Sequence, residues 1–109
     1  MVAPTAESLE KLIGTPRDGA LLRFSLGLEF SKRQDFPKAI EHLRRAVELD
    51  RGYSAAWRAL GKALESAGRT DEALAAYRDG IAAAQKKGDK QAEKEMSVFA
   101  RRIERKRAG

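Results

Sequence analysis

The stretch SAAWRALGKALESAGRTDEALAAYRDGIAAAQ, residues 54–85, has a counterpart 34 residues earlier, at residues 20–51. The positions that recur are the pairs Leu26 and Leu60, Gly27 and Gly61, Phe30 and Leu64, Ala39 and Ala73, Ile40 and Leu74, and Leu43 and Tyr77. Self-similarity at this period is typical of proteins that stack pairs of α-helices. The sequence therefore predicts an all-α repeat fold that serves as a binding module.

Helix start and stop signals divide the chain into six helices with no strands. The expected spans are residues 5–13, 16–33, 36–50, 53–67, 70–87 and 89–106. Thr15, Asp35 and Thr70 are the expected N-caps, because their side-chain oxygens can accept hydrogen bonds from the first turn of a helix. Gly68 is the expected left-handed residue at the end of the fourth helix. Turns of two to four residues between the later helices make neighbouring helices antiparallel.

At 109 residues the chain is expected to form one domain. Its expected parts are an N-terminal helix at 1–15, a first repeat at 16–52, a second repeat at 53–87 and a capping helix at 88–109. A shift of 36 aligns the last helix with the first helix of the second repeat: Ala56, Leu60, Ala63, Leu64 and Ala67 match Ala92, Met96, Phe99, Ala100 and Ile103. No second helix follows it, so we expect it to cover the apolar end of the array.

Two glycines are expected inside helices, where glycine costs about 1 kcal/mol relative to alanine. Gly27 and Gly61 occupy the same position in the two repeats. A missing side chain allows the partner helix to approach closely, and we expect the small residues Ala39 and Ala73 to face these glycines. A bulky side chain at either glycine should overpack the helix pair.

These residues resemble the tetratricopeptide repeat family. The second repeat carries the family's signature residues Trp57, Leu60, Gly61, Ala73 and Tyr77, and the first repeat carries Leu26, Gly27, Phe30, Ala39 and Ala46. The departures are Arg23 for the tryptophan, Leu64 for the aromatic, Gly80 for the second alanine, and Arg51 and Gln85 for the closing prolines. The resemblance covers residues 20–85. It implies a right-handed α-α superhelix of antiparallel helix pairs, whose concave side binds an extended peptide or a partner helix without catalysis.

Composition excludes several other functions. The chain has no cysteine and one histidine, so neither a disulfide nor a zinc site is expected, and no cofactor is implied. His42 is expected to lie in solvent rather than to act as a ligand or base, and we do not expect an enzyme. The first residues lack the pattern of a signal peptide, and no apolar run is long enough to span a membrane. The expected compartment is the cytoplasm.

The repeat shifts also predict a concave groove. The residues expected to line it are Phe24, Leu28, Ser31, Arg58, Lys62, Glu65, Lys94, Val98 and Arg101. Such a groove would be apolar at one end and basic beyond it, and would suit a protein segment or extended peptide with apolar and acidic residues, or a free carboxylate. In the alternative interpretation, the apolar face of the first helix (Leu9, Leu12 and Ile13) covers Phe24 and Leu28.

Two other kinds of partner are also compatible with the sequence. The net charge of +6 comes from residues 51–109, and the last nine residues contribute +4 of it. The basic side chains Arg101, Arg102, Arg105, Lys106 and Arg107 could bind nucleic acid or an anionic surface. They equally suit the negative end of a solvated helix, and no aromatic residue accompanies them for base stacking. We expect a monomer, with weak self-association through the last helix as an alternative.

Overall fold

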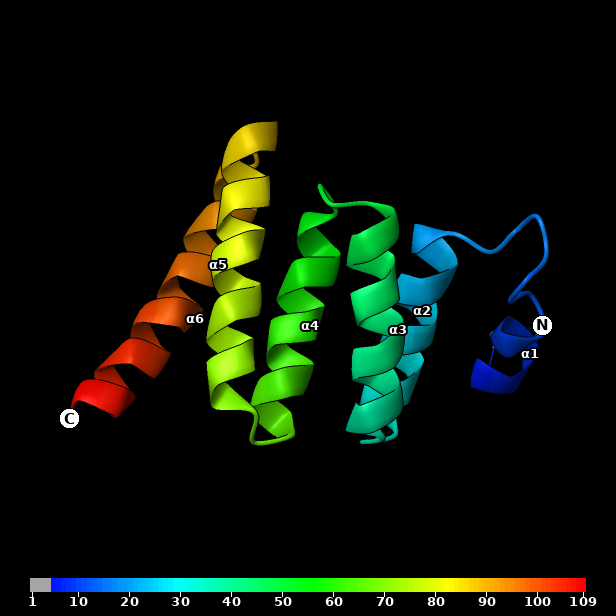
Figure 1. Ribbon diagram of the computed structural model, residues 1–109, viewed down its shortest axis with the longest axis horizontal. Helices are drawn as coiled ribbons and strands as arrows, with labels where there is room; N and C mark the ends of the chain where they lie inside the picture. Colours follow the sequence, from blue (N-terminus) through cyan, green and yellow to red (C-terminus); the bar gives the residue numbers. More distant parts are fainter. Residues whose placement is uncertain (1–4) are drawn as a thin grey trace.

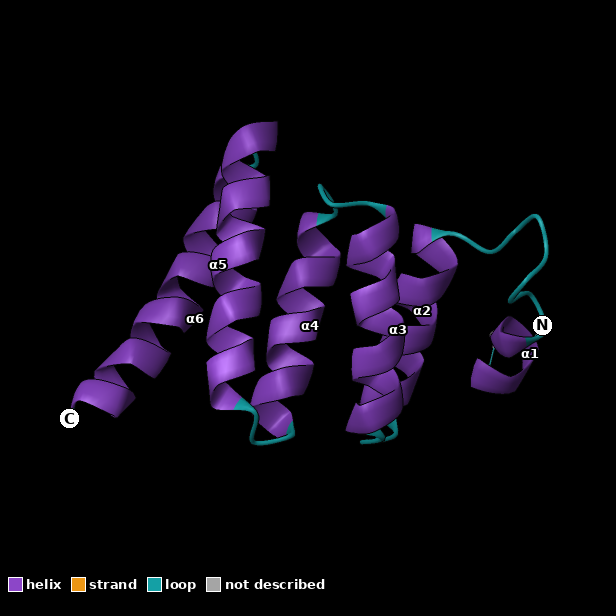
Figure 2. Cartoon of the chain, viewed as in Figure 1, coloured by secondary structure: helices purple, strands orange, loops and turns teal. Residues whose placement is uncertain are grey.

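The computed structural model describes residues 5–109 and places their helices in a row that follows the chain order (Figure 1). The helices are α1 (Ala6–Glu10), α2 (Ala20–Lys32), α3 (Phe36–Leu49), α4 (Ser54–Ser66), α5 (Thr70–Lys87) and α6 (Lys90–Ala108). Within residues 5–109 there are no strands, and short loops join most of the helices (Figure 2). The all-α prediction is confirmed. Residues 1–4 of the expected N-terminal segment lie outside the described residues.

Several helix ends lie at the positions expected from the sequence. Asp35 accepts a hydrogen bond from the backbone N–H of Lys38 at 3.3 Å and begins α3, and Asp89 accepts one from Ala92 at 3.1 Å and begins α6. Gly68 has a φ of +76°, the left-handed conformation that ends α4. The sequence therefore predicts these boundaries correctly, because each depends on one local hydrogen bond or one backbone angle.

Two predicted N-caps are wrong. Thr15 lies in the loop ahead of α2, which begins only at Ala20 after Gly19. Asp18 remains outside the helix because its carboxylate accepts a hydrogen bond from the Gly14 backbone N–H at 3.0 Å and pairs with Arg23 at 2.9 Å. These two contacts of Asp18 compete with the local capping pattern.

The second wrong N-cap is Thr70, which is the first residue of α5 and not its cap. The N-cap is Arg69, and the start of the helix has no side-chain capping hydrogen bond. Two acids in the first turn, Asp71 and Glu72, face the positive end of the helix dipole and stabilise the start instead.

The helices pack as antiparallel pairs, α2 with α3 and α4 with α5, and α6 packs on α5. Helix α4 also contacts α2 and α6, the helices that hold equivalent places in the array. The largest fully buried side chains, which form the core, are Leu26, Leu43, Leu60, Leu64, Tyr77 and Met96. The short α1 packs on α2 at one end of the row, where Glu7 pairs with Arg33 at 2.7 Å.

The glycines of the repeat face large side chains rather than alanines. A Cβ atom on Gly27 would lie 2.4 Å from Cγ of Leu43, and one on Gly61 would lie 2.2 Å from Cε1 of Tyr77. The glycines therefore make room for the bulky residue of the partner helix. The prediction of a close approach is confirmed, and the atoms nearest to the Cβ positions of the two glycines belong to Leu43 and Tyr77.

His42 is buried, which contradicts the prediction of a solvated side chain. Its ring stacks on Phe30, with centroids 5.6 Å apart and planes 7° apart, and its Nδ1 atom lies 3.3 Å from Arg23. Burial, and then the charge of Arg23, lower the pKa of His42 below its usual value of 6.5. Arg23 stands where the second repeat has Trp57, so the first repeat fills this region with a polar cluster.

Trp57 itself is a packing residue. Its side chain is buried, and its indole N–H donates a hydrogen bond to the Arg51 carbonyl at 2.9 Å.

Helix α6 covers the end of the array with one apolar face. Met96, Ala100 and Ile103 are buried, while Lys90 and Arg101 are exposed on the other side of the helix. None of the described helices is long and apolar enough to cross a membrane.

Candidate functional site

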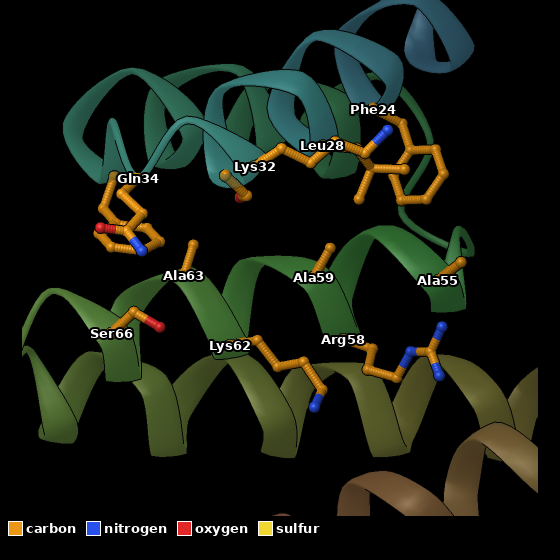
Figure 3. Close-up of a pocket in the computed structure, with 12 residues that line it drawn as sticks. Phe24, Leu28, Lys32, Gln34, Ala55, Arg58, Ala59, Lys62, Ala63 and Ser66 are labelled. Atoms are coloured by element: carbon orange, nitrogen blue, oxygen red, sulfur yellow. The ribbon is translucent and has the colours of Figure 1, made fainter.

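An open groove runs between α2 and α4 and has a volume of about 550 Å³ (Figure 3). Its lining residues are Phe24, Leu28, Ser31, Lys32, Gln34, Phe36, Ala55, Arg58, Ala59, Lys62, Ala63 and Ser66. A volume of this size can hold one or two amino-acid side chains of a partner.

The groove is open because one wall consists of short side chains. Ala55, Ala59 and Ala63 recur every four residues on α4 and point toward α2 in Figure 3. Phe24 and Leu28 form the opposite wall, and the Phe24 ring is supported by Tyr53, with centroids 4.9 Å apart. Leu28 remains 38% exposed. An apolar surface of this kind favours burial of an apolar side chain from a partner.

The charged residues of the lining are all basic: Lys32, Arg58 and Lys62. Arg58 and Lys62 leave α4 on the side away from the alanines and extend toward α6 (Figure 3). There Arg58 pairs with Glu95 at 2.7 Å, and the Lys62 Nζ atom lies 4.4 Å from the centroid of the Phe99 ring. The groove therefore combines an apolar slot with two cations on its rim.

The structure brings together five of the predicted groove residues: Phe24, Leu28, Ser31, Arg58 and Lys62. The remaining predicted residues lie outside this groove. Glu65 accepts a hydrogen bond from the Tyr77 hydroxyl at 2.6 Å. Burial raises the pKa of that hydroxyl, and the bond to Glu65 raises it further.

The predicted residues of α6 lie apart from this groove. Lys94 and Arg101 line a separate shallow concavity of about 350 Å³ along α6, together with Lys90, Glu93 and Ser97. Val98 is exposed on the same helix. The shift of 36 aligns the buried face of α6 correctly but does not bring these three side chains to the groove between α2 and α4.

The first helix does not cover Phe24 and Leu28. Leu9, Leu12 and Ile13 are partly buried against the core, but α1 contributes no residue to the groove lining. Sequence reasoning missed Lys32, Gln34 and Phe36 at one end of the groove, and Ala55, Ala59 and Ala63 along one wall. The regular spacing of the three alanines was the signal that could have revealed that wall.

Another, smaller concavity of about 240 Å³ lies between α4 and α6. It is lined by Ser54, Ala55, Arg58, Asp89, Gln91, Ala92 and Glu95. Arg58 therefore borders both concavities. Residues 5–109 contain no cluster of histidine, cysteine and carboxylate side chains that could hold a metal ion.

Stacked antiparallel helix pairs with a groove between successive first helices define the class of helical-repeat proteins. Comparison with known proteins narrows this class: the family model described as Tetratricopeptide repeat matches residues 24–88. The chain belongs to the tetratricopeptide repeat family. Proteins of this family generally mediate protein–protein interactions and typically have no catalytic activity.

Relatives extend the similarity over nearly the whole chain. The TPR repeat-containing protein PA0015 of Pseudomonas aeruginosa is 50% identical over 101 residues, which are 93% of this chain and 96% of that protein. The solution structure of protein BPP2914 from Bordetella parapertussis matches with a TM-score of 0.82 and 41% identity, covering 98% of this chain and 93% of that one. A tetratricopeptide repeat domain protein from Salinibacter ruber matches with a TM-score of 0.73 and 28% identity, covering 80% and 97% of the two chains.

Proposed function

We propose that this protein is a cytoplasmic, non-catalytic adaptor that binds a segment of another protein in the groove between α2 and α4. The observation that carries the proposal is the open slot of about 550 Å³ with Phe24 and Leu28 on one wall and alanines on the other. Leu28 is 38% exposed, so binding an apolar partner residue would remove apolar surface from water. In this proposal the protein acts as a monomer that presents one groove.

The charges of the groove indicate that the partner segment also carries acidic residues. Its lining has three cations, Lys32, Arg58 and Lys62, and no aspartate or glutamate. A partner segment with a bulky apolar residue next to one or two acidic residues would therefore match both features. Charge complementarity of this kind contributes to specificity and to the rate of association.

A selection from random peptides tests the proposal. A phage-displayed library of random dodecapeptides is panned against the wild-type protein, the Ala59→Phe variant and the Ala82→Phe variant. Ala59 lies in the middle of the slot, whereas Ala82 is exposed on α5 and is absent from the groove lining. Both variants add one phenyl ring, so they differ only in where that ring lies.

We expect the wild type and Ala82→Phe to enrich the same peptides, with a bulky apolar residue beside aspartate or glutamate. Ala59→Phe should lose these peptides while its circular dichroism spectrum remains helical. Replacing Arg58 and Lys62 together by glutamine should weaken binding of the acidic peptides. If Ala59→Phe retains the same peptides as the wild type, the groove is not the binding site.

A second candidate function is binding of a polyanion through α6. It is favoured by the basic side chains near the C-terminus that have no acidic partner in the described part of the chain. Among the ion pairs of residues 5–109, Arg107 bonds to Asp71 at 3.1 Å, whereas Arg101, Arg102, Arg105 and Lys106 have no acidic partner. Binding of a single-stranded oligonucleotide through these cations would weaken steeply between about 50 and 200 mM salt. Fluorescence anisotropy over that range distinguishes it from peptide binding, which should be less sensitive to salt.

A further inference from the structure

Arg58 is shared between two features of the molecule. Its side chain borders the groove between α2 and α4 and also the smaller concavity between α4 and α6. Its Nη1 atom lies 2.7 Å from the Glu95 carboxylate, and its guanidinium points away from the alanine wall, toward α6 (Figure 3). An acidic residue of the protein itself therefore already occupies the arginine that the ligand would use.

We propose that Glu95 is an internal competitor for the ligand carboxylate, and so a residue that determines the specificity of the groove. The proposal rests on the function proposed above. A carboxylate delivered by a bound segment would replace Glu95 on Arg58, and Glu95 would turn into solvent. A neutral ligand fills the apolar slot without this exchange.

The exposure of the ion pair makes the exchange feasible. The side chains of Arg58 and Glu95 are 42% and 34% exposed, so Glu95 can become hydrated when it leaves. Ion pairs this accessible to water contribute little net free energy. The competition should therefore tune the affinity for acidic ligands without preventing their binding.

Lys62 shows why Arg58 is the cation for which the competition matters. The Lys62 Nζ atom lies over the Phe99 ring at 4.4 Å from its centroid and has no ion pair among the described residues. An ammonium that lies over an aromatic face can still donate hydrogen bonds to a carboxylate. A ligand with two adjacent acids would use Lys62 directly and Arg58 only after displacing Glu95.

The test compares Glu95→Gln with Glu104→Gln. Glu104 is also on α6 and also forms an exposed ion pair, to Arg78 at 2.9 Å, so both variants remove one negative charge and one ion pair from the same helix. Only Glu95→Gln releases Arg58. A peptide selected on the wild type is synthesised in two forms, with its acidic residues and with glutamine in their place, and titrated by isothermal calorimetry.

We expect Glu95→Gln to tighten binding of the acidic peptide about two- to fivefold, the range that corresponds to an exposed ion pair. Binding of the glutamine peptide should not change, and Glu104→Gln should affect neither. Equal tightening by both variants would overturn the proposal, because it would reflect net charge alone. Equal tightening for both peptides would also overturn it, because Glu95 would then act on the shape of the groove.

Failure of the underlying binding function gives a different result. If the groove is not the site, Ala59→Phe binds the acidic peptide as well as Ala82→Phe does, whatever residue stands at position 95. The competition proposal then fails together with that function. If Ala59→Phe binds the acidic peptide more weakly than Ala82→Phe does, but Glu95→Gln has no effect, the groove is the binding site and only the competition proposal is overturned.

Discussion

The groove between α2 and α4 and the concavity between α4 and α6 occupy equivalent places in the array, yet the first is open and the second is largely filled. The groove between α2 and α4 has a volume of about 550 Å³, whereas the space between α4 and α6 has about 240 Å³. In each case two helices that hold the same position in successive repeats lie side by side. We attribute the difference in volume to the side chains that stand at equivalent positions in the two places.

Two positions on the later helix account for the difference. The shift of 36 that relates α4 to α6 places Glu95 where the open groove has Ala59, and Phe99 where it has Ala63. Opposite them, Arg58 bonds to Glu95, and Lys62 lies over the Phe99 ring. In the open groove the matching residues are Phe24 and Leu28, and the positions opposite them on α4 are the alanines Ala59 and Ala63. The helical repeat determines where a groove can form, and these side chains determine whether it stays open.

The largest effect on stability is expected at Tyr77, which connects the filled concavity between α4 and α6 to the core. Its ring occupies the space that a side chain at Gly61 would need, and it lies 5.5 Å from the Phe99 ring between centroids. Tyr77→Ala should lower the free energy of unfolding by about 3–5 kcal/mol, because it leaves a large cavity. Urea denaturation measures this. A loss of unfolding free energy below about 1 kcal/mol would show that Tyr77 does not stabilise the packing around the filled concavity between α4 and α6.

The equivalent residue in the first repeat, Leu43, provides the matched control. It is fully buried and lies against Gly27 as Tyr77 lies against Gly61. Leu43→Ala should cost about 2–5 kcal/mol. The two variants should differ in their effect on α6: only Tyr77→Ala should accelerate hydrogen exchange there.

A smaller effect is expected at Gly80, which allows α6 to pack closely. A Cβ atom there would lie 2.5 Å from Sδ of Met96 and 2.7 Å from Cβ of Trp57. Met96 is flexible, but the Cβ atom of Trp57 can move only with its helix. Gly80→Ala should therefore overpack this contact and lower the free energy of unfolding by about 1–3 kcal/mol.

The first repeat tests the cause of that effect. Its equivalent of Gly80 is Ala46, which is fully buried and fits its surroundings. Hydrogen exchange should accelerate in α6 of Gly80→Ala and remain unchanged in α2. An unchanged melting temperature for Gly80→Ala would mean that α6 can shift without cost, and the filled concavity would then depend on Glu95 and Phe99 alone.

The sequence predicts the parts of this molecule that depend on local or periodic signals. The period of 34 residues gives the helix pairs, and the cap at Asp35 needs only the next turn of the chain. The apolar wall of the groove, Phe24 and Leu28, also follows from the repeat shift. These features could be predicted because each is repeated in the sequence or completed within one helical turn.

The rest depends on contacts between distant residues. His42 is a polar residue on the outer helix of its pair, and only its stacking on Phe30 and its contact with Arg23 explain its burial. The direction of Arg58 is set by Glu95, which is 37 residues further along the chain. A pattern along one helix contains no information about which distant side chain it will meet, so the paired state of Arg58 could not be predicted.

The repeats should also differ in their response to pH. His42 in the first repeat corresponds to the buried Ala76 in the second. Because burial and Arg23 lower the pKa of His42 in the folded state, the unfolded chain binds a proton more readily below pH 6.5. The stability contributed by neutral His42 should therefore be present above pH 6.5 and be lost as the pH falls below it.

Urea denaturation between about pH 7.5 and pH 5 measures this dependence. The His42→Ala variant, which copies the second repeat, should lose less stability over this interval than the wild type does. Three acids near the histidine, Glu10, Asp18 and Glu41, favour its charged form and reduce the effect. Equal pH dependence in the two proteins would show that these acids fully offset burial.

The smallest effect is expected for the contact between Lys62 and Phe99, which helps to distinguish the filled concavity from the open groove. A cation over an aromatic ring at an exposed site contributes about 0.5–1 kcal/mol. A double-mutant cycle with Lys62→Met and Phe99→Leu isolates this coupling from the other contacts of each residue. Methionine retains most of the length of the lysine side chain, and leucine retains an apolar group of similar reach.

We expect the two substitutions together to cost about 0.5–1 kcal/mol less than the sum of their separate costs in urea denaturation. Arg102 also lies near the Phe99 ring, at 5.3 Å from its centroid, so the cycle with Arg102→Met serves as a comparison at a longer distance. Its coupling should be the smaller of the two. Strictly additive costs for Lys62 and Phe99 would mean that Phe99 fills the concavity by its volume alone, and that the ring does not hold Lys62 away from the open groove.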